Sequence, residues 1–156
     1  MRITLGQRTE ETAAIYFRRA QDAAIRAVLP QRAKTLEEAL ADYRETLEPG
    51  AKSYGRTILA DSQYVGDVWC YAMDRSGDPQ AMVSYCVFEQ ALWGRGIAAQ
   101  ALGLFLAEIR ERFGLERIGA FTFDANRGSV RVLEKNGFHL AEKLVEDGVA
   151  SGYYVR

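Results

Sequence analysis

A glycine-containing turn near the middle of the chain has the composition of an anion-binding site. Two glycines permit a sharp turn and a close backbone approach to a ligand. The first N–H groups of a following helix lack intrahelical acceptors and, with the helix dipole, attract anions. An arginine beside them adds a guanidinium suited to phosphate. The turn therefore predicts a phosphate site, or else a simple tight turn, over Trp93-Gly94-Arg95-Gly96-Ile97-Ala98.

Two familiar phosphate-binding loops do not fit this turn. A Walker loop requires Gly-Lys followed by Ser or Thr, and no such sequence follows Gly96. A dinucleotide-binding fingerprint requires a third glycine and a parallel sheet, whereas here the third glycine is missing and the preceding strands are expected to be antiparallel. Both of these loop classes are therefore excluded.

A second motif lies downstream, between Asn126 and Phe138. Asn126 can cap a helix there, and Gly137 ends it. The two motifs, in this order, resemble those of the GCN5-related N-acetyltransferase (GNAT) superfamily. With Trp93 at its start, the first motif is similar to that of a narrower branch, the ribosomal-protein-alanine acetyltransferases (RimJ/RimL-type). The resemblance is strong from Ala81 to Phe138 and only general over the first 50 residues.

The resemblance implies an N-acetyltransferase that uses acetyl-CoA as cosubstrate. A primary amine would attack the acetyl carbonyl directly in a ternary complex. The pyrophosphate would lie on the glycine turn, and the pantetheine arm would meet the end of the preceding strand. The residues expected to bind the cofactor are Val87, Phe88, Trp93, Gly94, Arg95, Gly96, Ile97, Ala98, Asn126, Ser129 and Arg131.

Direct attack requires a neutral amine, and a lysine-like amine is neutral in only about one molecule in a thousand at pH 7. A general base is therefore expected. Many members of the branch carry a glutamate after an alanine on the fourth strand, but here Ala81 is followed by Met82. Glu89 is our first candidate for the base, with Asp67 and Asp124 open as alternatives.

A general acid could assist departure of the thiolate. Ser129 is the first candidate, because the resemblance places it near the thioester sulfur. Tyr153 and Tyr154 are alternatives, since a C-terminal tyrosine serves as the acid in some superfamily members. Each of these residues could instead have a purely structural role, in helix capping or strand packing.

The elements that must position these residues follow from hydrophobic periodicity, caps and turns. The order predicts an α/β (α+β) fold with a mixed, mostly antiparallel sheet and helices on both faces, and the resemblance implies that this sheet is of the GNAT type. Strands are expected over residues 2–5, 55–60, 64–73, 80–88, 117–123, 138–144 and 153–156. Helices are expected over 9–29, with a break inside, from 35 to before Pro49, over 97–113 and over 126–136.

Length and charge describe an ordinary globular protein. The 156 residues predict one domain, 1–156, with 20 basic and 21 acidic side chains and a net charge of −1. No basic stripe is present, so we expect no nucleic-acid partner. No apolar run could span a bilayer and no leader pattern is visible, so we expect no membrane partner.

Cysteine and histidine usage favours a reducing compartment and a site without a metal. Cys70 and Cys86 lie in apolar runs without metal or redox spacing, as expected for buried thiols of a cytoplasmic protein. His139 is the single histidine, which excludes metal sites built on several histidines.

The acceptor and the oligomeric state stay open at this point. The resemblance implies an amine acceptor, either a peptide N-terminus or a small molecule, and dimers are common in the superfamily, so a homodimer is one expected form. The alternative to an enzyme is a non-catalytic acyl-CoA-binding or regulatory module. We consider this alternative because Met82 occupies the position at which many members of the branch carry a glutamate.

Overall fold

The computed structural model describes residues 1–156, which form one seven-stranded sheet and five α-helices. A short 3-10 helix, η1 (Gln90–Leu92), precedes the glycine turn. The helices are α1 (Glu10–Arg19), α2 (Ala23–Val28), α3 (Leu36–Glu45), α4 (Ile97–Phe113) and α5 (Arg127–Lys135). The strands are β1 (Ile3–Gln7), β2 (Tyr54–Ala60), β3 (Gln63–Asp74), β4 (Gln80–Val87), β5 (Arg117–Phe123), β6 (His139–Glu146) and β7 (Val149–Val155).

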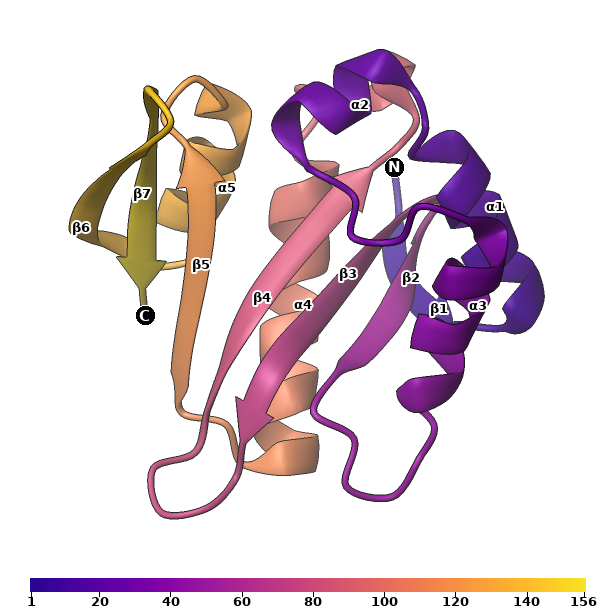
Figure 1. Ribbon diagram of the computed structural model, residues 1–156, viewed down its shortest axis with the longest axis horizontal. Helices are drawn as coiled ribbons and strands as arrows, with labels where there is room; N and C mark the ends of the chain where they lie inside the picture. The colour runs from indigo at the N-terminus through magenta and orange to yellow at the C-terminus, as the bar shows by residue number, and fades with distance from the viewer.

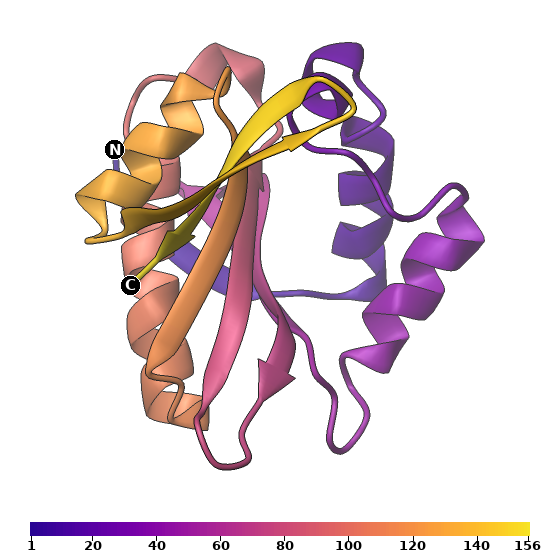
Figure 2. The same ribbon diagram turned by 60° about the vertical axis from the view of Figure 1, so that its left-hand side comes forward.

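The strands lie in the order β1-β2-β3-β4-β5-β7-β6, and every neighbouring pair is antiparallel except β4 with β5. Helices α4 and α5 cover one face of the sheet, and α1, α2 and α3 lie on the other (Figure 2). This arrangement confirms the predicted mixed, mostly antiparallel sheet with helices on both faces.

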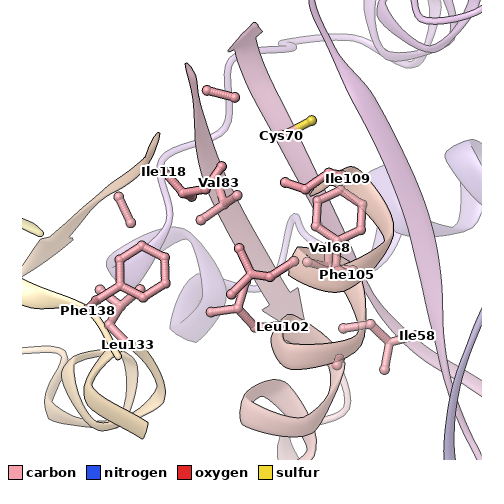
Figure 3. Close-up of a cluster of buried hydrophobic side chains, with 14 of the residues drawn as sticks. Ile58, Val68, Cys70, Val83, Leu102, Phe105, Ile109, Ile118, Leu133 and Phe138 are labelled. Atoms are coloured by element: carbon pink, nitrogen blue, oxygen red, sulfur yellow. The ribbon is translucent and has the colours of Figure 1, made fainter. Parts of the chain in front are cut away.

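The main core lies between α4 and the sheet. Leu102, Phe105 and Ile109 of α4 have no exposed surface and pack with residues such as Val68 and Val83 of the strands (Figure 3). Their three- and four-residue spacing puts them on one side of the helix, as the periodicity predicts. This packing fixes α4 against the sheet and so positions the turn at its N-terminus.

Local sequence signals place most helix ends. Thr35 caps α3 by accepting a hydrogen bond from the Glu38 N–H at 3.1 Å. The Glu38 carboxylate accepts from the Lys34 N–H at 2.8 Å, one residue earlier than a reciprocal capping box requires. The predicted break inside residues 9–29 is confirmed, because Asp22 caps a separate helix by accepting from the Ala24 N–H at 2.9 Å.

The C-terminal strand is longer than the sequence predicts. It begins at Val149, not Tyr153, and forms a hairpin with β6 through Asp147 and Gly148, both with positive φ. Residues Val149 to Gly152 join the strand because they pair with β6 and β5, which local propensity does not reveal.

The structure also contains no helix with the length and apolarity needed to cross a membrane.

Candidate active site

The two parallel strands at the centre of the sheet separate along their length. β4 and β5 pair only at Gln80–Met82 with Arg117–Gly119. Beyond that point the strands diverge toward their carboxyl ends, as Figure 1 shows. The β5-facing edge of β4 therefore has no strand partner from Val83 onward, so its backbone groups are open to another ligand.

A cavity of about 1150 Å³ lies at this opening. That is large enough for an extended cofactor, since ordinary ligand pockets span about 300–1000 Å³. It reaches both faces of the sheet, because it touches α2 on one face and α5 on the other. Its walls include residues 83–87 of β4, 96–99 at the start of α4, 120–123 of β5 and 125–129 around the start of α5.

The glycine turn opens onto this cavity. Gly94 and Gly96 have φ values of 80° and 79°, which a residue with a side chain rarely adopts. Gly96 is the N-cap of α4 and supplies no side-chain acceptor, so the first N–H groups of the helix are left for a ligand. Ile97 and Ala98 also line the cavity, whereas Arg95 is exposed and outside its walls.

Trp93 ties the turn to the end of β4. Its indole Nε1 donates a hydrogen bond to the Val87 carbonyl oxygen at 2.6 Å. The Phe88 N–H donates to the Val65 carbonyl at 2.9 Å, and the Phe88 side chain is buried away from the cavity. Of the backbone groups expected to meet the pantetheine arm, the Val87 carbonyl and the Phe88 N–H are thus already bonded within the protein.

The second motif forms the opposite wall. Asn126 caps α5 by accepting a hydrogen bond from the Ser129 N–H at 3.2 Å, and both residues line the cavity. Arg127, Arg131 and Lys135 also line it from α5. Three cationic side chains on this one helix make the wall electropositive and suited to phosphate groups.

Tyr85 is a site residue that the sequence analysis missed. Its Oη lies 2.7 Å from Ser129 Oγ, where either hydroxyl can donate, and it also donates to the Ser129 carbonyl at 3.2 Å. Burial raises the pKa of Tyr85, so its hydroxyl stays protonated at neutral pH. The pair connects β4 to α5 across the opening. The available signal was a tyrosine between Val83 and Val87 on an otherwise apolar strand face.

The candidate acid–base residues fall in different places. Glu89 and Asp124 lie outside the cavity walls and are ion-paired, to Arg19 at 2.9 Å and to Lys143 at 2.6 Å. Tyr153 also lies outside the walls, with its ring centroid 5.0 Å from that of Phe121. Tyr154 is buried in the main core.

Asp67, in contrast, lines a second cavity of about 680 Å³ beneath α1 and α3. The two cavities adjoin on the face of the sheet that α1, α2 and α3 cover, because they share four wall residues. The shared residues are Leu29, Pro30, Tyr71 and Ser84. No group of three or more His, Cys, Asp or Glu side chains is arranged to hold a metal ion.

The turn, the divergent strands and the capped α5 can be compared with known proteins. A model of the acetyltransferase (GNAT) domain matches residues 2–139. The chain belongs to the GNAT acetyltransferase family. The match confirms the superfamily that the two motifs predict, and the domain extends well beyond them into the first 50 residues, where the sequence resemblance was only general.

A sequence relative of this GNAT domain is the probable N-acetyltransferase YjcK of Bacillus subtilis (strain 168). The two are 32% identical over 101 residues. The aligned segment covers 64% of this chain and 55% of the Bacillus protein, so the match spans about half of that relative's length.

Solved structures share the fold of this GNAT domain across almost all of its length. Spermidine N-acetyltransferase from Vibrio cholerae, in complex with CoA and spermine, has a TM-score of 0.86 at 14% identity and covers 99% of this chain and 94% of its own. RimL, a ribosomal L7/L12 alpha-N-protein acetyltransferase in complex with coenzyme A, has a TM-score of 0.84 at 18% identity, covering 99% and 93%. At these identities the likeness establishes the fold.

Proposed function

We propose that residues 1–156 act as one N-acetyltransferase domain, which moves the acetyl group of acetyl-CoA to a primary amine by direct attack. The observation that carries this proposal is the large cavity between β4 and β5, onto which both motifs open. Open space beside the backbone of Gly94 and Gly96 leaves room for a pyrophosphate, because a Cβ atom built on either glycine would meet no atom within 4 Å.

In this proposal the first-turn N–H groups of α4 bind the pyrophosphate. The free edge of β4 binds the pantetheine arm, apart from the Val87 carbonyl that Trp93 occupies. Arg131 lies where it can neutralise a further phosphate group. The acetyl carbonyl is then presented near Ser129, and the amine approaches from the face covered by α1, α2 and α3.

We assign the general acid to Ser129 and not to Tyr153, because Ser129 lines the cavity and Tyr153 does not. The neutral Tyr85 hydroxyl hydrogen-bonds Ser129 and holds the Ser129 hydroxyl in place, and the proton that Ser129 gives to the departing sulfur is replaced by one that the amine loses as the amide forms. Proton donation of this kind typically contributes a factor of 10²–10⁴ to the rate.

Replacing Ser129 with alanine is therefore expected to lower kcat by about 10–100-fold. The dissociation constant for acetyl-CoA should change by less than about threefold, since backbone groups provide most of the proposed binding. Steady-state kinetics with calorimetric binding separate the two effects, and Tyr85→Phe should give a smaller loss of kcat. An unchanged kcat in Ser129→Ala would restrict Ser129 to a structural role.

The acceptor is proposed to be a primary amine on a small molecule or a peptide N-terminus. This class of acceptor is supported by the structural neighbours, which include enzymes named for spermidine and for ribosomal protein.

We also propose a cytoplasmic location, where the free cysteines Cys70 and Cys86 remain reduced. A homodimer, a common form in the superfamily, is tested by light scattering on the purified protein.

The test of the proposed function is thiol release from acetyl-CoA with a panel of polyamines, aminoglycosides and N-terminal peptides. At least one acceptor should increase release well above the rate of hydrolysis. Tight acetyl-CoA binding without transfer to any acceptor would favour the alternative, a non-catalytic acyl-CoA-binding module. Absence of any binding to coenzyme A would contradict both.

A further inference from the structure

The second cavity contains a buried carboxylate at its wall. Asp67 is 2% exposed and lines this cavity together with the aromatic side chains of Tyr16, Trp69 and Tyr71. Tyr71 and Ser84 belong to both cavities, so a molecule in the second cavity would reach the end of the first at this point. The carboxylate therefore lines a cavity that adjoins the proposed cofactor site.

Strand register places Asp67 close to that junction. β3 and β4 pair Asp67 with Cys86 and Trp69 with Ser84. Asp67 and Ser84 are therefore diagonal neighbours of the antiparallel ladder, which lie about 7–8 Å apart, with their Cβ atoms somewhat closer. Since Ser84 lines both cavities, Asp67 lies within reach of a molecule at their junction.

A bulge in β3 aims a hydrogen-bond donor at the same carboxylate. The pairing with β2 passes from Ile58 opposite Gly66 to Leu59 opposite Tyr64, which leaves Val65 as the extra residue. Strict alternation would put Tyr64 and Asp67, three residues apart, on opposite faces. The bulge brings them to one face, where Tyr64 Oη donates to Asp67 Oδ1 at 2.6 Å.

An arginine from beyond β1 completes the environment. Arg8 Nε donates to Asp67 Oδ2 at 2.9 Å. Its guanidinium crosses Gly55 of β2, where a Cβ atom would lie 2.3 Å from Arg8 Cζ, so the absence of a side chain at Gly55 leaves room for the contact. The carboxylate is thus held in one orientation by two donors from different parts of the chain.

Burial raises the pKa of Asp67 to about 6, against the opposing effects of Arg8 and of the hydrogen bond from Tyr64. The negative charge of Asp67 in turn acts on Tyr16 of α1 and Cys86 of β4, whose pKa values are raised mainly by burial. Those two groups are neutral near pH 7. Asp67 is therefore mostly ionised at pH 7, yet far more basic than an exposed carboxylate.

We propose that Asp67 is the general base of the acetyl transfer and that its carboxylate contacts the acceptor's ammonium group in the second cavity. This inference rests on the proposed function. Asp67 takes one proton from the ammonium, and the freed lone pair of nitrogen forms the N–C bond to the acetyl carbon. The C–S bond breaks with its electron pair on sulfur. The second nitrogen proton is lost and balances the one that sulfur gains, and Asp67 releases its proton to solvent.

Asp67→Asn is the direct test, because asparagine keeps the shape and one hydrogen-bond acceptor. We expect kcat to fall about 100-fold or more with the best acceptor, while the dissociation constant for acetyl-CoA stays within about threefold. The acid limb of the kcat/KM–pH profile near pH 6 should disappear. Asp74→Asn, at the exposed end of the same strand, is the control and should leave both rate and profile unchanged.

Tyr64→Phe tests the same inference without removing the carboxylate. It deletes a hydrogen bond that stabilises the ionised form, so the acid limb should move to higher pH. A purely structural role for Asp67 would not shift that limb, and an unshifted limb in Tyr64→Phe overturns the proposal even if Asp67→Asn fails to fold.

The competing base is tested with Glu89→Gln. Loss of the acid limb in that variant, or a folded Asp67→Asn that keeps wild-type kcat, would overturn the proposal. Both outcomes require that the wild-type protein turns over, so they differ from failure of the proposed function, in which no acceptor gives thiol release at all.

Discussion

Gly96→Trp is expected to abolish coenzyme A binding, with a loss of affinity of at least about 100-fold, or about 2.8 kcal/mol. Gly96 is the N-cap of α4 and lines the large cavity. Because space beside it is open, an indole there would fill the region in front of the first-turn N–H groups where the pyrophosphate is proposed to bind. Isothermal titration calorimetry with coenzyme A measures the loss.

Gly114→Trp is the matched control for this variant. Gly114 is the C-cap of the same helix, also has positive φ (68°) and open space around it, and lies outside both cavities. Each substitution puts a side chain into the left-handed region, at a similar cost of about 1–2 kcal/mol. A folded Gly96→Trp that binds coenzyme A as tightly as Gly114→Trp would refute the pyrophosphate site.

Phe105→Ala should lower the free energy of unfolding by about 3–5 kcal/mol. The ring is completely buried between α4 and the sheet (Figure 3). It stacks on Tyr54, with centroids 6.0 Å apart and planes 10° apart. Truncation removes the buried surface and leaves a cavity that the surrounding strands fill only in part. Thermal unfolding should show a melting temperature lower by roughly 10 °C.

Leu104→Ala provides the comparison, since Leu104 precedes Phe105 on the same helix but is 46% exposed. Its expected effect is within about 0.5 kcal/mol. Equal effects in the two variants would mean that α4 does not depend on this packing. The expected difference matters for function, because α4 carries the N-terminus at which the pyrophosphate is proposed to bind.

Features encoded by neighbouring residues could be predicted from the sequence. The positive φ values of Gly94 and Gly96, the cap at Asn126 and the capping of α3 by Thr35 all depend on residues within a few positions of each other. The two motifs also indicated the family, and the order of the predicted elements indicated the mixed sheet. What these local signals share is that their physical cause lies in the backbone conformation of one short segment.

The catalytic groups could not be chosen in this way. Glu89 was the first candidate for the base, with Asp67 and Asp124 as alternatives. Only the structure shows that Asp67 is buried at a cavity wall, whereas the other two carboxylates lie outside both cavities. Tyr85 was overlooked because its partner Ser129 is 44 positions away. Such pairs depend on which strands become neighbours and on their register.

The sequence by itself therefore determined the conformation of a turn, which its own glycines allow and at which a phosphate is proposed to bind. Only the tertiary structure decided what surrounds that turn: the divergence of β4 from β5, the joining of two cavities at Ser84, and the orientation of Asp67 by Arg8, 59 positions away. The physical reason is that a bulge at Val65 and the space above Gly55 act through packing between strands, which no local pattern records.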